Sequence, residues 1–267
     1  MPAKARPALS VTYSNYLHLE ELLGAQRPLS DGPEHDELLF IVIHQVYELW
    51  FKQMLHETRY LMNALDADDT PRVQATFKRL LTVLKLQVAQ IDILETMSPV
   101  SFLSFRSRLE AASGFQSPQF RELEFALGKR SREMIAHHAG TAAAEKLEGA
   151  LAEASLWDVF ARFLARHGVR VPESLLARDR SQSNPECPDL QSELVRIYCE
   201  HPDLAQVCER LVDLDEGIQE WRYRHVKMVE RTIGTKAGTG GSSGADYLRR
   251  TLFQPLFPDL WAIRAAL

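Results

Sequence analysis

The sequence contains few cysteines and no long hydrophobic run. Its 267 residues include three cysteines, Cys187, Cys199 and Cys208, and no Cys-x-x-Cys spacing. This odd number argues against a disulfide framework or a structural zinc site, and it is typical of a protein in the reducing cytoplasm. The apolar run before His44, Leu38–Ile43, is too short to span a membrane. The amino-terminal ten residues lack the apolar core of a signal peptide.

The sequence also lacks an excess of basic residues. Lys and Arg together number 31, Asp and Glu number 36, and the formal net charge is −5. A mildly acidic chain without a long basic run is poorly suited to bind nucleic acid or an anionic membrane. Hydrophobic residues make up 45% of the chain and charged residues 25%, which is the balance of an ordinary globular protein.

Convincing runs of alternating β-branched residues are absent as well, so we predict an all-α fold. Capping residues precede proline at Thr70-Pro71, Ser98-Pro99 and Ser117-Pro118, which predicts helix starts. Gly128 and Gly168 are expected to end helices. The predicted helices cover residues 11–23, 34–65, 71–96, 99–109, 118–127, 141–153, 155–167, 187–200, 202–233 and 245–254.

The three longest predicted helices are expected to share one core, so that residues 1–267 form a single domain. We expect residues 1–10 to be disordered and residues 11–24 to form an N-terminal arm. The polar segment Arg178–Asp189 is predicted to be a surface loop. Thr235–Gly244 is rich in glycine and has three possible roles: an anion-binding nest, a lid over a substrate carboxylate, or a flexible connection.

One histidine, His44, lies on an apolar stripe of a predicted long helix. At helical spacing it shares this stripe with Phe40, Tyr47, Phe51 and Leu55. Such a stripe normally contains only core residues. The histidine is therefore either a core residue bonded to a backbone carbonyl or the polar point of an apolar pocket.

A second histidine, His225, occupies the same kind of stripe in the helix predicted at 202–233. The stripe consists of Leu211, Leu214, Ile218, Trp221, His225, Met228 and Thr232. Two such histidines on two of the longest helices favour a haem pocket, because a haem is an apolar plate that needs an imidazole on its iron. A purely helical scaffold with two core histidines remains an alternative.

Other metal sites lack their ligand patterns. His56-Glu57 is not followed by the second histidine of an HExxH motif, and none of the nine histidines belongs to an ExxH pair. No Cys-x-x-Cys-His is present, so any haem would be held non-covalently. Cys187 could offer a thiolate to haem, but it lies in a polar segment.

The predicted helix after Ser98 places Phe102, Phe105 and Arg106 within about one turn of each other. An arginine beside aromatic rings can hold a carboxylate while the rings stack on an aromatic ligand. The alternative is an arginine that extends to the surface.

Five segments together resemble one known family. They are TYSNYLHLEELL (Thr12–Leu23), HDELLFIVIHQVYELWFKQ (His35–Gln53), ILETMSP (Ile93–Pro99), FRSRLEAASGFQS (Phe105–Ser117) and WRYRHVKMVERTIGTKAGTGGSSG (Trp221–Gly244). Their combination resembles the tryptophan 2,3-dioxygenase family. The resemblance covers most of residues 12–125 and 211–260, whereas residues 130–200 carry little signal.

The resemblance implies an all-α enzyme whose long helices enclose a non-covalent haem b, ferrous in the active form. Such an enzyme opens the indole ring of L-tryptophan with O2 to give N-formyl-L-kynurenine, the first step of tryptophan catabolism by the kynurenine route. It also implies a homotetramer in which the N-terminal arm packs on a neighbouring subunit. A haem sensor on the same fold and a broader indoleamine dioxygenase are the alternatives.

The resemblance also implies roles for individual residues. His225 matches the proximal iron ligand, His44 the distal histidine near the indole nitrogen, and Phe40 a wall of the substrate pocket. Arg106 matches the residue that binds the substrate carboxylate, and Thr239 the hydroxyl that contacts the amino-acid head group. His44 could act as a base or as a positioning group; we favour positioning, because an indole N–H is far less acidic than an imidazolium.

Three further residues are implied at the substrate site. Tyr13 and Tyr16 match residues that help to close a neighbouring subunit's site. Phe102 departs from the family pattern, because some members have a tyrosine there whose hydroxyl lies near the substrate carboxylate. Losing one such hydrogen bond costs about 0.5–1.5 kcal/mol of binding. We therefore expect a modest effect on affinity and none on the type of reaction.

Overall fold

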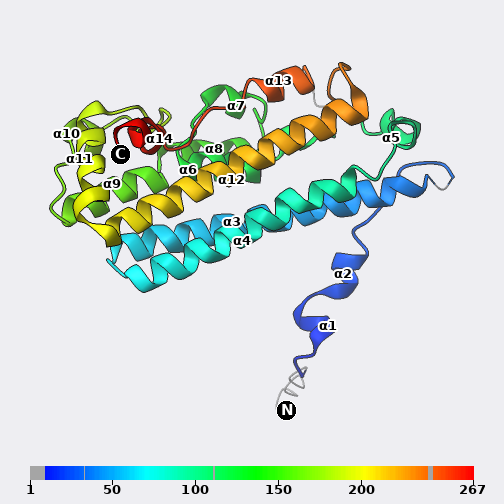
Figure 1. Ribbon diagram of the computed structural model, residues 1–267. Helices are drawn as coiled ribbons and strands as arrows, with labels where there is room; N and C mark the ends of the chain where they lie inside the picture. The colour runs from blue at the N-terminus through cyan, green and yellow to red at the C-terminus, as the bar shows by residue number, and fades with distance from the viewer. Residues whose placement is uncertain (1–9, 33, 111, 240–242) are drawn as a thin grey trace, which may run out of the picture.

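The computed structural model describes residues 10–32, 34–110, 112–239 and 243–267. The disorder predicted for residues 1–10 therefore lies almost wholly outside the described residues. Within the described ranges the regular secondary structure is helical, without a strand, which confirms the predicted all-α fold. Three long helices, α3 (His35–Asp66), α4 (Thr70–Leu94) and α12 (Pro202–Ile233), form the body, and α4 packs against the other two (Figure 1).

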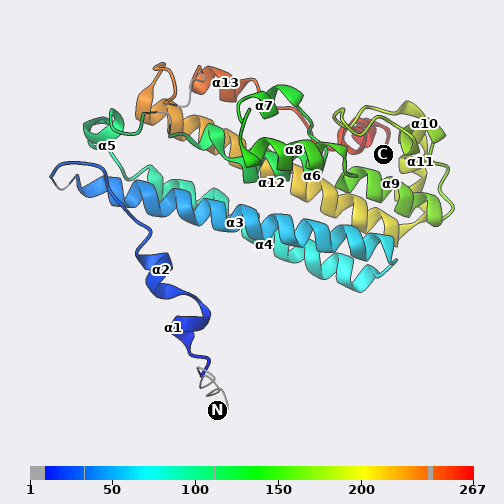
Figure 2. The ribbon, with the colours of Figure 1, turned by 180° about the vertical axis from the view of Figure 1, so that it is seen from behind.

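Shorter helices cover the ends and one side of these three (Figures 1 and 2). They are α5 (Pro99–Arg106), α6 (Pro118–Leu127), α7 (Arg132–Ala136), α8 (Ala142–Ala152), α9 (Leu156–Arg166), α10 (Glu173–Leu176), α11 (Pro188–Glu200), α13 (Ala245–Arg249) and α14 (Pro258–Ala262), with 3-10 turns η1 (Gly114–Gln116) and η2 (Ile263–Ala266). The helices α7, α10 and α14 were not predicted from the sequence. The helix predicted at 245–254 ends at Arg249.

The predicted caps have a clear structural basis. The Ser98 and Ser117 hydroxyls accept hydrogen bonds from the backbone N–H groups three residues later, at 3.1 Å in each case. The α4 start lies one residue earlier than expected, because Asp69 accepts the hydrogen bond from the Arg72 N–H. Gly128 ends α6 with a φ of 102°. These interactions satisfy backbone groups that a helix end leaves free.

A single large hydrophobic cluster joins the long helices to the C-terminal segment. The buried rings of Trp157 and Phe257 stack with their centroids 5.6 Å apart. The fully buried Asp215 accepts hydrogen bonds from the Leu256 N–H, the Phe257 N–H and the Trp261 indole N–H at 2.8–3.0 Å. The carboxylate thus ties the chain after α13 to the middle of α12.

The polar segment Arg178–Asp189 is held by the arginine at its start. Arg178 forms a bidentate ion pair with Asp158 of α9, at 2.7 and 3.2 Å, and donates to the Gln182 carbonyl at 2.8 Å. The same guanidinium donates to the Asn184 side chain at 3.0 Å. Bidentate pairs of this kind fix geometry as well as charge. The segment is therefore an anchored loop.

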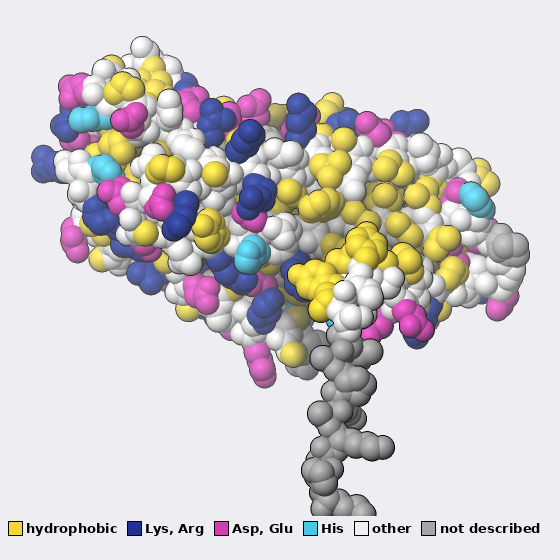
Figure 3. Space-filling view, turned by 90° about the horizontal axis from the view of Figure 1, so that it is seen from below, with side chains coloured by type: hydrophobic (Ala, Val, Ile, Leu, Met, Phe, Trp, Pro, Cys, Tyr) yellow, Lys and Arg dark blue, Asp and Glu magenta, His cyan; other side chains and the backbone are white. Residues whose placement is uncertain are grey.

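The N-terminal arm consists of α1 (Tyr13–Tyr16) and α2 (Leu19–Leu23), not of the one helix predicted at 11–23. His18, with a φ of 52°, separates the two helices. Both helices project from the body and bury no residue of their own (Figures 1 and 2). Figure 3 shows hydrophobic side chains gathered on the face from which the arm leaves.

In the described part of the chain, no helix has the length and apolar character needed to cross a membrane.

Candidate functional site

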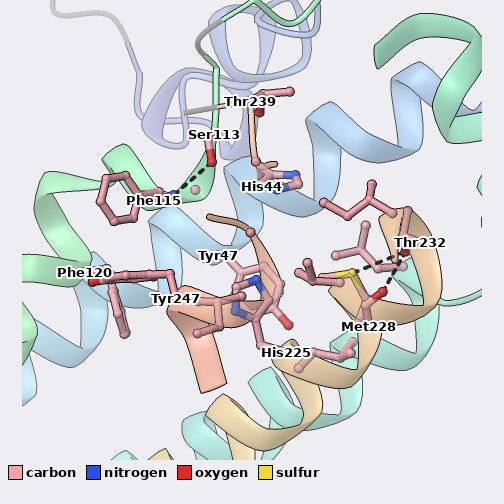
Figure 4. A pocket seen from close by; sticks show the side chains of 18 of the residues that line it. His44, Tyr47, Ser113, Phe115, Phe120, His225, Met228, Thr232, Thr239 and Tyr247 are labelled. Carbon is pink, nitrogen blue, oxygen red and sulfur yellow. Dashed lines mark hydrogen bonds between the residues drawn. The ribbon is translucent and has the colours of Figure 1, made fainter. Parts of the chain in front are cut away.

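One cavity, with a volume of about 220 Å³, lies between α3, α5, α6 and α12. This volume is far larger than the roughly 10–15 Å³ that a single water molecule needs. Its walls are mostly apolar and aromatic, and the segment that contains Gly238 and Thr239 borders it. Figure 4 shows His44 of α3 and His225 of α12 in this cavity. The two stripes predicted from the sequence thus meet at one site.

His44 is oriented by the helix that carries it. Its Nδ1 lies 2.7 Å from the Phe40 carbonyl, and the ring centroids of the two side chains are 4.1 Å apart. A carbonyl oxygen can only accept, so Nδ1 carries the proton and Nε2 of the neutral ring is left as an acceptor. Burial lowers the pKa of His44, although the bond to the carbonyl opposes this shift. The ring is therefore neutral near pH 7.

His225 is held by ring stacking and not by a hydrogen bond. Its ring stacks on Trp221, one turn earlier in α12, with centroids 5.3 Å apart and planes 16° apart. It forms no hydrogen bond with any residue that the structure describes. Burial, with a smaller effect from the nearby His44, lowers the pKa of His225 to about 4. A neutral imidazole with an unused nitrogen faces the cavity.

An aromatic cluster supports the Trp221 ring. The rings of Phe120, Phe51 and Tyr47 lie 5.1, 6.1 and 6.2 Å from it in tilted or edge-on contacts. Such contacts stabilise aromatic pairs beyond their buried area. The Tyr47 hydroxyl donates to the Gln87 carbonyl at 2.7 Å, and burial raises its pKa to about 12. The wall beside His225 is therefore aromatic, and its Tyr47 hydroxyl stays uncharged near pH 7.

Arg106 and Thr239 lie together at another border of the cavity. Arg106 Nη2 donates to the Ala237 carbonyl, and the Thr239 hydroxyl donates to the Ala112 carbonyl at 2.8 Å. These bonds attach the glycine-rich segment to the last residue of α5 and to the chain that follows this helix. The Arg106 Nε is buried without a hydrogen-bond partner in the described part of the chain. Since an unpaired buried donor is costly, this N–H is available to an anion.

Phe102 lines the cavity as an apolar residue. Its ring is buried, and its centroid lies 5.8 Å from that of Phe40 and 5.5 Å from that of Phe105. Tyr13 and Tyr16 do not border the cavity of their own chain, because both lie on the projecting arm with 75% and 74% of their surface exposed. The roles predicted for these three residues stay predictions.

A buried ion cluster in the cavity wall was missed by the sequence reasoning. Glu124 of α6 accepts from Arg121 Nη1 at 2.6 Å and from Arg222 Nη2 of α12 at 2.8 Å. Burial alone would raise the pKa of Glu124, but the two guanidinium groups outweigh it and hold this pKa below its usual range. The i,i+3 spacing of Arg121 and Glu124 was a visible signal, but their partner on α12 is distant in sequence.

The fold and the cavity define an all-α protein with a buried, histidine-lined ligand pocket. The family model for tryptophan 2,3-dioxygenase matches residues 3–167 and 186–267. The gap in this match falls within the middle region that carried little sequence signal.

Individual relatives match nearly the whole chain. A tryptophan 2,3-dioxygenase of Herpetosiphon aurantiacus is 56% identical over 258 residues, which cover 97% of this chain and 99% of the relative. The protein of the same name from Anaeromyxobacter sp. strain K is 56% identical over 259 residues, or 97% of each chain. That of Caulobacter vibrioides is 43% identical over 97% of this chain and the full length of the relative. The chain belongs to the tryptophan 2,3-dioxygenase family.

This family implies a haem cofactor, and the residues of the cavity fit one. An iron ligand must be a neutral imidazole with a free nitrogen, and His225 meets both conditions. The surrounding walls are aromatic and aliphatic, as the faces of a porphyrin require. The buried Arg106 Nε without a partner suits the carboxylate of an amino-acid substrate.

Proposed function

We propose that this protein opens the indole ring of L-tryptophan with O2 and forms N-formyl-L-kynurenine. The observation that carries the proposal is the meeting of His44, His225 and Arg106 in one apolar cavity, although they lie on three different helices. The family membership supports the same reaction. We further propose a non-covalently held haem b, ferrous in the active form, which supplies the site for O2 and the oxidation chemistry.

His225 is the residue that would hold the haem iron. No described residue forms a hydrogen bond with the His225 ring. The plane of this ring is therefore set by stacking on Trp221. The aromatic cluster around Trp221 excludes water from this side of the cavity. Water exclusion strengthens every polar interaction made inside the pocket. Stacking therefore holds the His225 imidazole in one orientation, and no charged residue is needed to orient it.

Arg106 and Thr239 are proposed to bind the amino-acid end of the substrate. A guanidinium can hold a carboxylate with two parallel hydrogen bonds, and the free Arg106 Nε is one of the donors that such a contact uses. The Thr239 hydroxyl lies on the neighbouring segment, at the same border of the cavity. Phe40 and Phe102 provide apolar surface for the indole ring. Fixing one end of the substrate places its reactive bond, which lowers the entropic cost of reaction.

His44 is proposed to position the indole. Its Nδ1–H donates a hydrogen bond to the Phe40 carbonyl, so its Nε2 can accept a hydrogen bond from the indole N–H. Burial lowers the pKa of His44 and so makes it a weaker base. A weaker base is less able to remove a proton as poorly acidic as that of indole. Positioning is therefore favoured over proton abstraction.

We also propose a homotetramer in which the arm of one subunit packs on a neighbour. The exposed apolar side chains of the arm support this proposal, with Val11, Tyr13 and Leu23 at least 72% exposed. Surfaces of this kind usually mark a protein contact. A cytoplasmic location is proposed from the three free cysteines.

Two measurements test the proposed reaction. The purified protein is expected to show the Soret band of a histidine-ligated haem, and L-tryptophan with reductant and O2 is expected to give an absorbing formylkynurenine product. A chain that takes up no haem would contradict the proposal, and a haem protein without turnover would indicate a sensor. Activity on D-tryptophan and tryptamine would indicate a broader indoleamine dioxygenase and not an enzyme specific for L-tryptophan.

The carboxylate contact can be tested with a matched pair of variants. Arg106→Ala is expected to raise the KM for L-tryptophan on the order of tenfold or more, because it removes a charge-assisted hydrogen bond. Tryptamine lacks the carboxylate, so its KM should change little. Arg108→Ala is the control, since this residue lies on the same segment but pairs with the exposed Asp31. Equal effects on both substrates would exclude the proposed contact.

A further inference from the structure

The buried ion cluster in the cavity wall carries more positive than negative charge. Arg121 and Arg222 share one carboxylate, that of Glu124, and all three residues are at most 7% exposed. Neither arginine forms an ion pair with any other described residue. The cluster therefore leaves one positive charge without a counter-ion among the residues that the structure describes. Burying a charge without a counter-ion is strongly unfavourable.

Arg121 leaves more donors unused than Arg222, whose Nη1 and Nη2 donate to the Gln254 carbonyl and to Glu124. Arg121 Nη1 binds Glu124, and the other N–H groups of this guanidinium form no hydrogen bond with any residue that the structure describes. The guanidinium carbon lies 5.5 Å from the centroids of both the Phe115 and Phe120 rings. These contacts hold the planar group in place. The free N–H groups of Arg121, which borders the cavity, are thus oriented before any ligand binds.

We propose that Arg121, held in place by its ion pair with Glu124 and through it linked to Arg222, binds a propionate carboxylate of the haem and so forms the propionate seat. This inference rests on the proposed function, which places a haem in the cavity. A haem is apolar except for its two propionates, so an otherwise apolar pocket needs a cationic group where they lie. Arg106 is a separate arginine, on α5 beside the Ala237 carbonyl, and is assigned to the substrate. The haem propionate and the substrate carboxylate are then bound by arginines of different helices, α6 and α5.

The chemistry of the propionates provides the test. The full-length chain is prepared without haem and loaded with either haem b or its dimethyl ester, in which both propionates are neutral. Loss of each pigment to excess apomyoglobin is followed by the Soret band. Arg121→Met is expected to speed the loss of haem b on the order of tenfold or more. The loss of the dimethyl ester should stay nearly unchanged, because no anion remains for Arg121 to bind.

A matched control separates this effect from a general loss of stability. Arg130 is as buried as Arg121, at 7% exposure, but it lies outside the cavity and donates to the carbonyls of Ala150 and Glu153. Arg130→Met is expected to alter the loss of both pigments by the same factor. Arg121→Lys keeps the charge, so it should retain part of the preference for haem b.

The possible outcomes distinguish the two levels of the proposal. Equal changes for haem b and the ester in both Arg121 variants would overturn the propionate seat while leaving haem binding intact. A shift in L-tryptophan affinity with no difference between the pigments would also overturn it, since the cluster would then serve the substrate. A wild-type chain that holds neither pigment would overturn the proposed function, and this inference with it.

Discussion

At the scale of single residues, the structure separates two histidines that look alike in the sequence. Both lie on apolar stripes, but His44 is bonded to the Phe40 carbonyl while His225 rests on the Trp221 ring. A backbone hydrogen bond fixes the tautomer of His44, whereas His225 keeps both nitrogens free of described partners. Sequence could identify the two residues by their periodicity. Periodicity could not assign their roles, which only the family resemblance implied, because these roles depend on side-chain rotation and on neighbours distant in the chain.

This difference predicts opposite effects of two alanine substitutions. His225→Ala is expected to lose haem during purification, because it removes the imidazole proposed to bind iron. His44→Ala should keep the haem and lower kcat/KM for L-tryptophan by roughly tenfold or more, as expected for a lost positioning hydrogen bond in a dry site. The ratio of Soret to protein absorbance measures haem content, and steady-state turnover measures the second effect. Haem loss in His44→Ala but not in His225→Ala would reverse the assignment.

The second prediction at this scale concerns Phe102, which stands where some family members have a tyrosine. The buried ring borders the same cavity as Arg106, and from the family resemblance we expect a hydroxyl added to it to lie near a bound carboxylate. Phe102→Tyr is expected to lower the KM for L-tryptophan by up to about tenfold, the value of one added hydrogen bond. The KM for tryptamine should not improve. A higher KM for both substrates would show that the hydroxyl is too large for the pocket.

At the scale of elements, the long helices were predictable and the short ones were not. Helices α3, α4 and α12 have sustained apolar stripes and clear caps, and their bounds agree with the prediction to within about two residues. The unpredicted helices α7, α10 and α14 contain four or five residues, too few to show an amphipathic repeat. They form because tertiary contacts hold them. One example is the contact of the Tyr247 hydroxyl with the Met134 sulfur of α7 at 3.2 Å.

The end of α6 offers a prediction about stability. Gly128 has a φ of 102°, and a Cβ added there would lie 2.1 Å from Asn184 Nδ2. That amide donates to the Leu256 carbonyl at 2.8 Å, so Gly128→Ala would both strain the backbone and displace this bond. We expect a loss of about 2–3 kcal/mol in the free energy of unfolding. Gly149→Ala is the control: it lies within α8 with open space around it and should gain about 0.5–1 kcal/mol.

Chemical denaturation of the two glycine variants measures both effects. A Gly128→Ala protein as stable as the wild type would mean that the loop around Asn184 moves aside at little cost. A loss of stability in Gly149→Ala as well would point to a general sensitivity of this region, and not to the C-terminal end of α6.

At the scale of the whole molecule, the sequence predicted that the two long helices with histidines and the helix of Arg106 contribute to the site, but not that α6 borders it as well. The neighbouring aromatic residues suggested that Arg106 holds a carboxylate, but its contact with the glycine-rich segment could not be predicted, because Arg106 and Ala237 are 131 positions apart. The Arg121–Glu124–Arg222 cluster is of the same kind, since Glu124 and Arg222 are 98 positions apart. Contacts between distant segments leave no periodic pattern in a sequence. Hydrophobic stripes along single helices do leave such a pattern, and most of the fold could be predicted from them.

The projecting arm yields a prediction about assembly. Tyr13 and Tyr16 are about three-quarters exposed and far from the cavity of their own chain, so any role at a site must be played in another subunit. A chain without residues 1–24 is expected to fold and bind haem, because α1 and α2 bury no side chain. If the arm closes a neighbouring site as proposed, turnover should fall sharply, because that site is left open. Full turnover by this shortened chain would exclude the proposed role of the arm.

Mixed oligomers test the exchange directly. The shortened chain has an intact site but no arm, whereas a full-length His225→Ala chain has an arm but no working site. Neither should be active alone. Co-expressed in equal amounts, they are expected to recover roughly a quarter of full activity, because half of the subunits have a working site and half of their neighbours supply an arm. If the arm packed on its own subunit, every chain would lack either its site or its arm, and mixing would restore nothing.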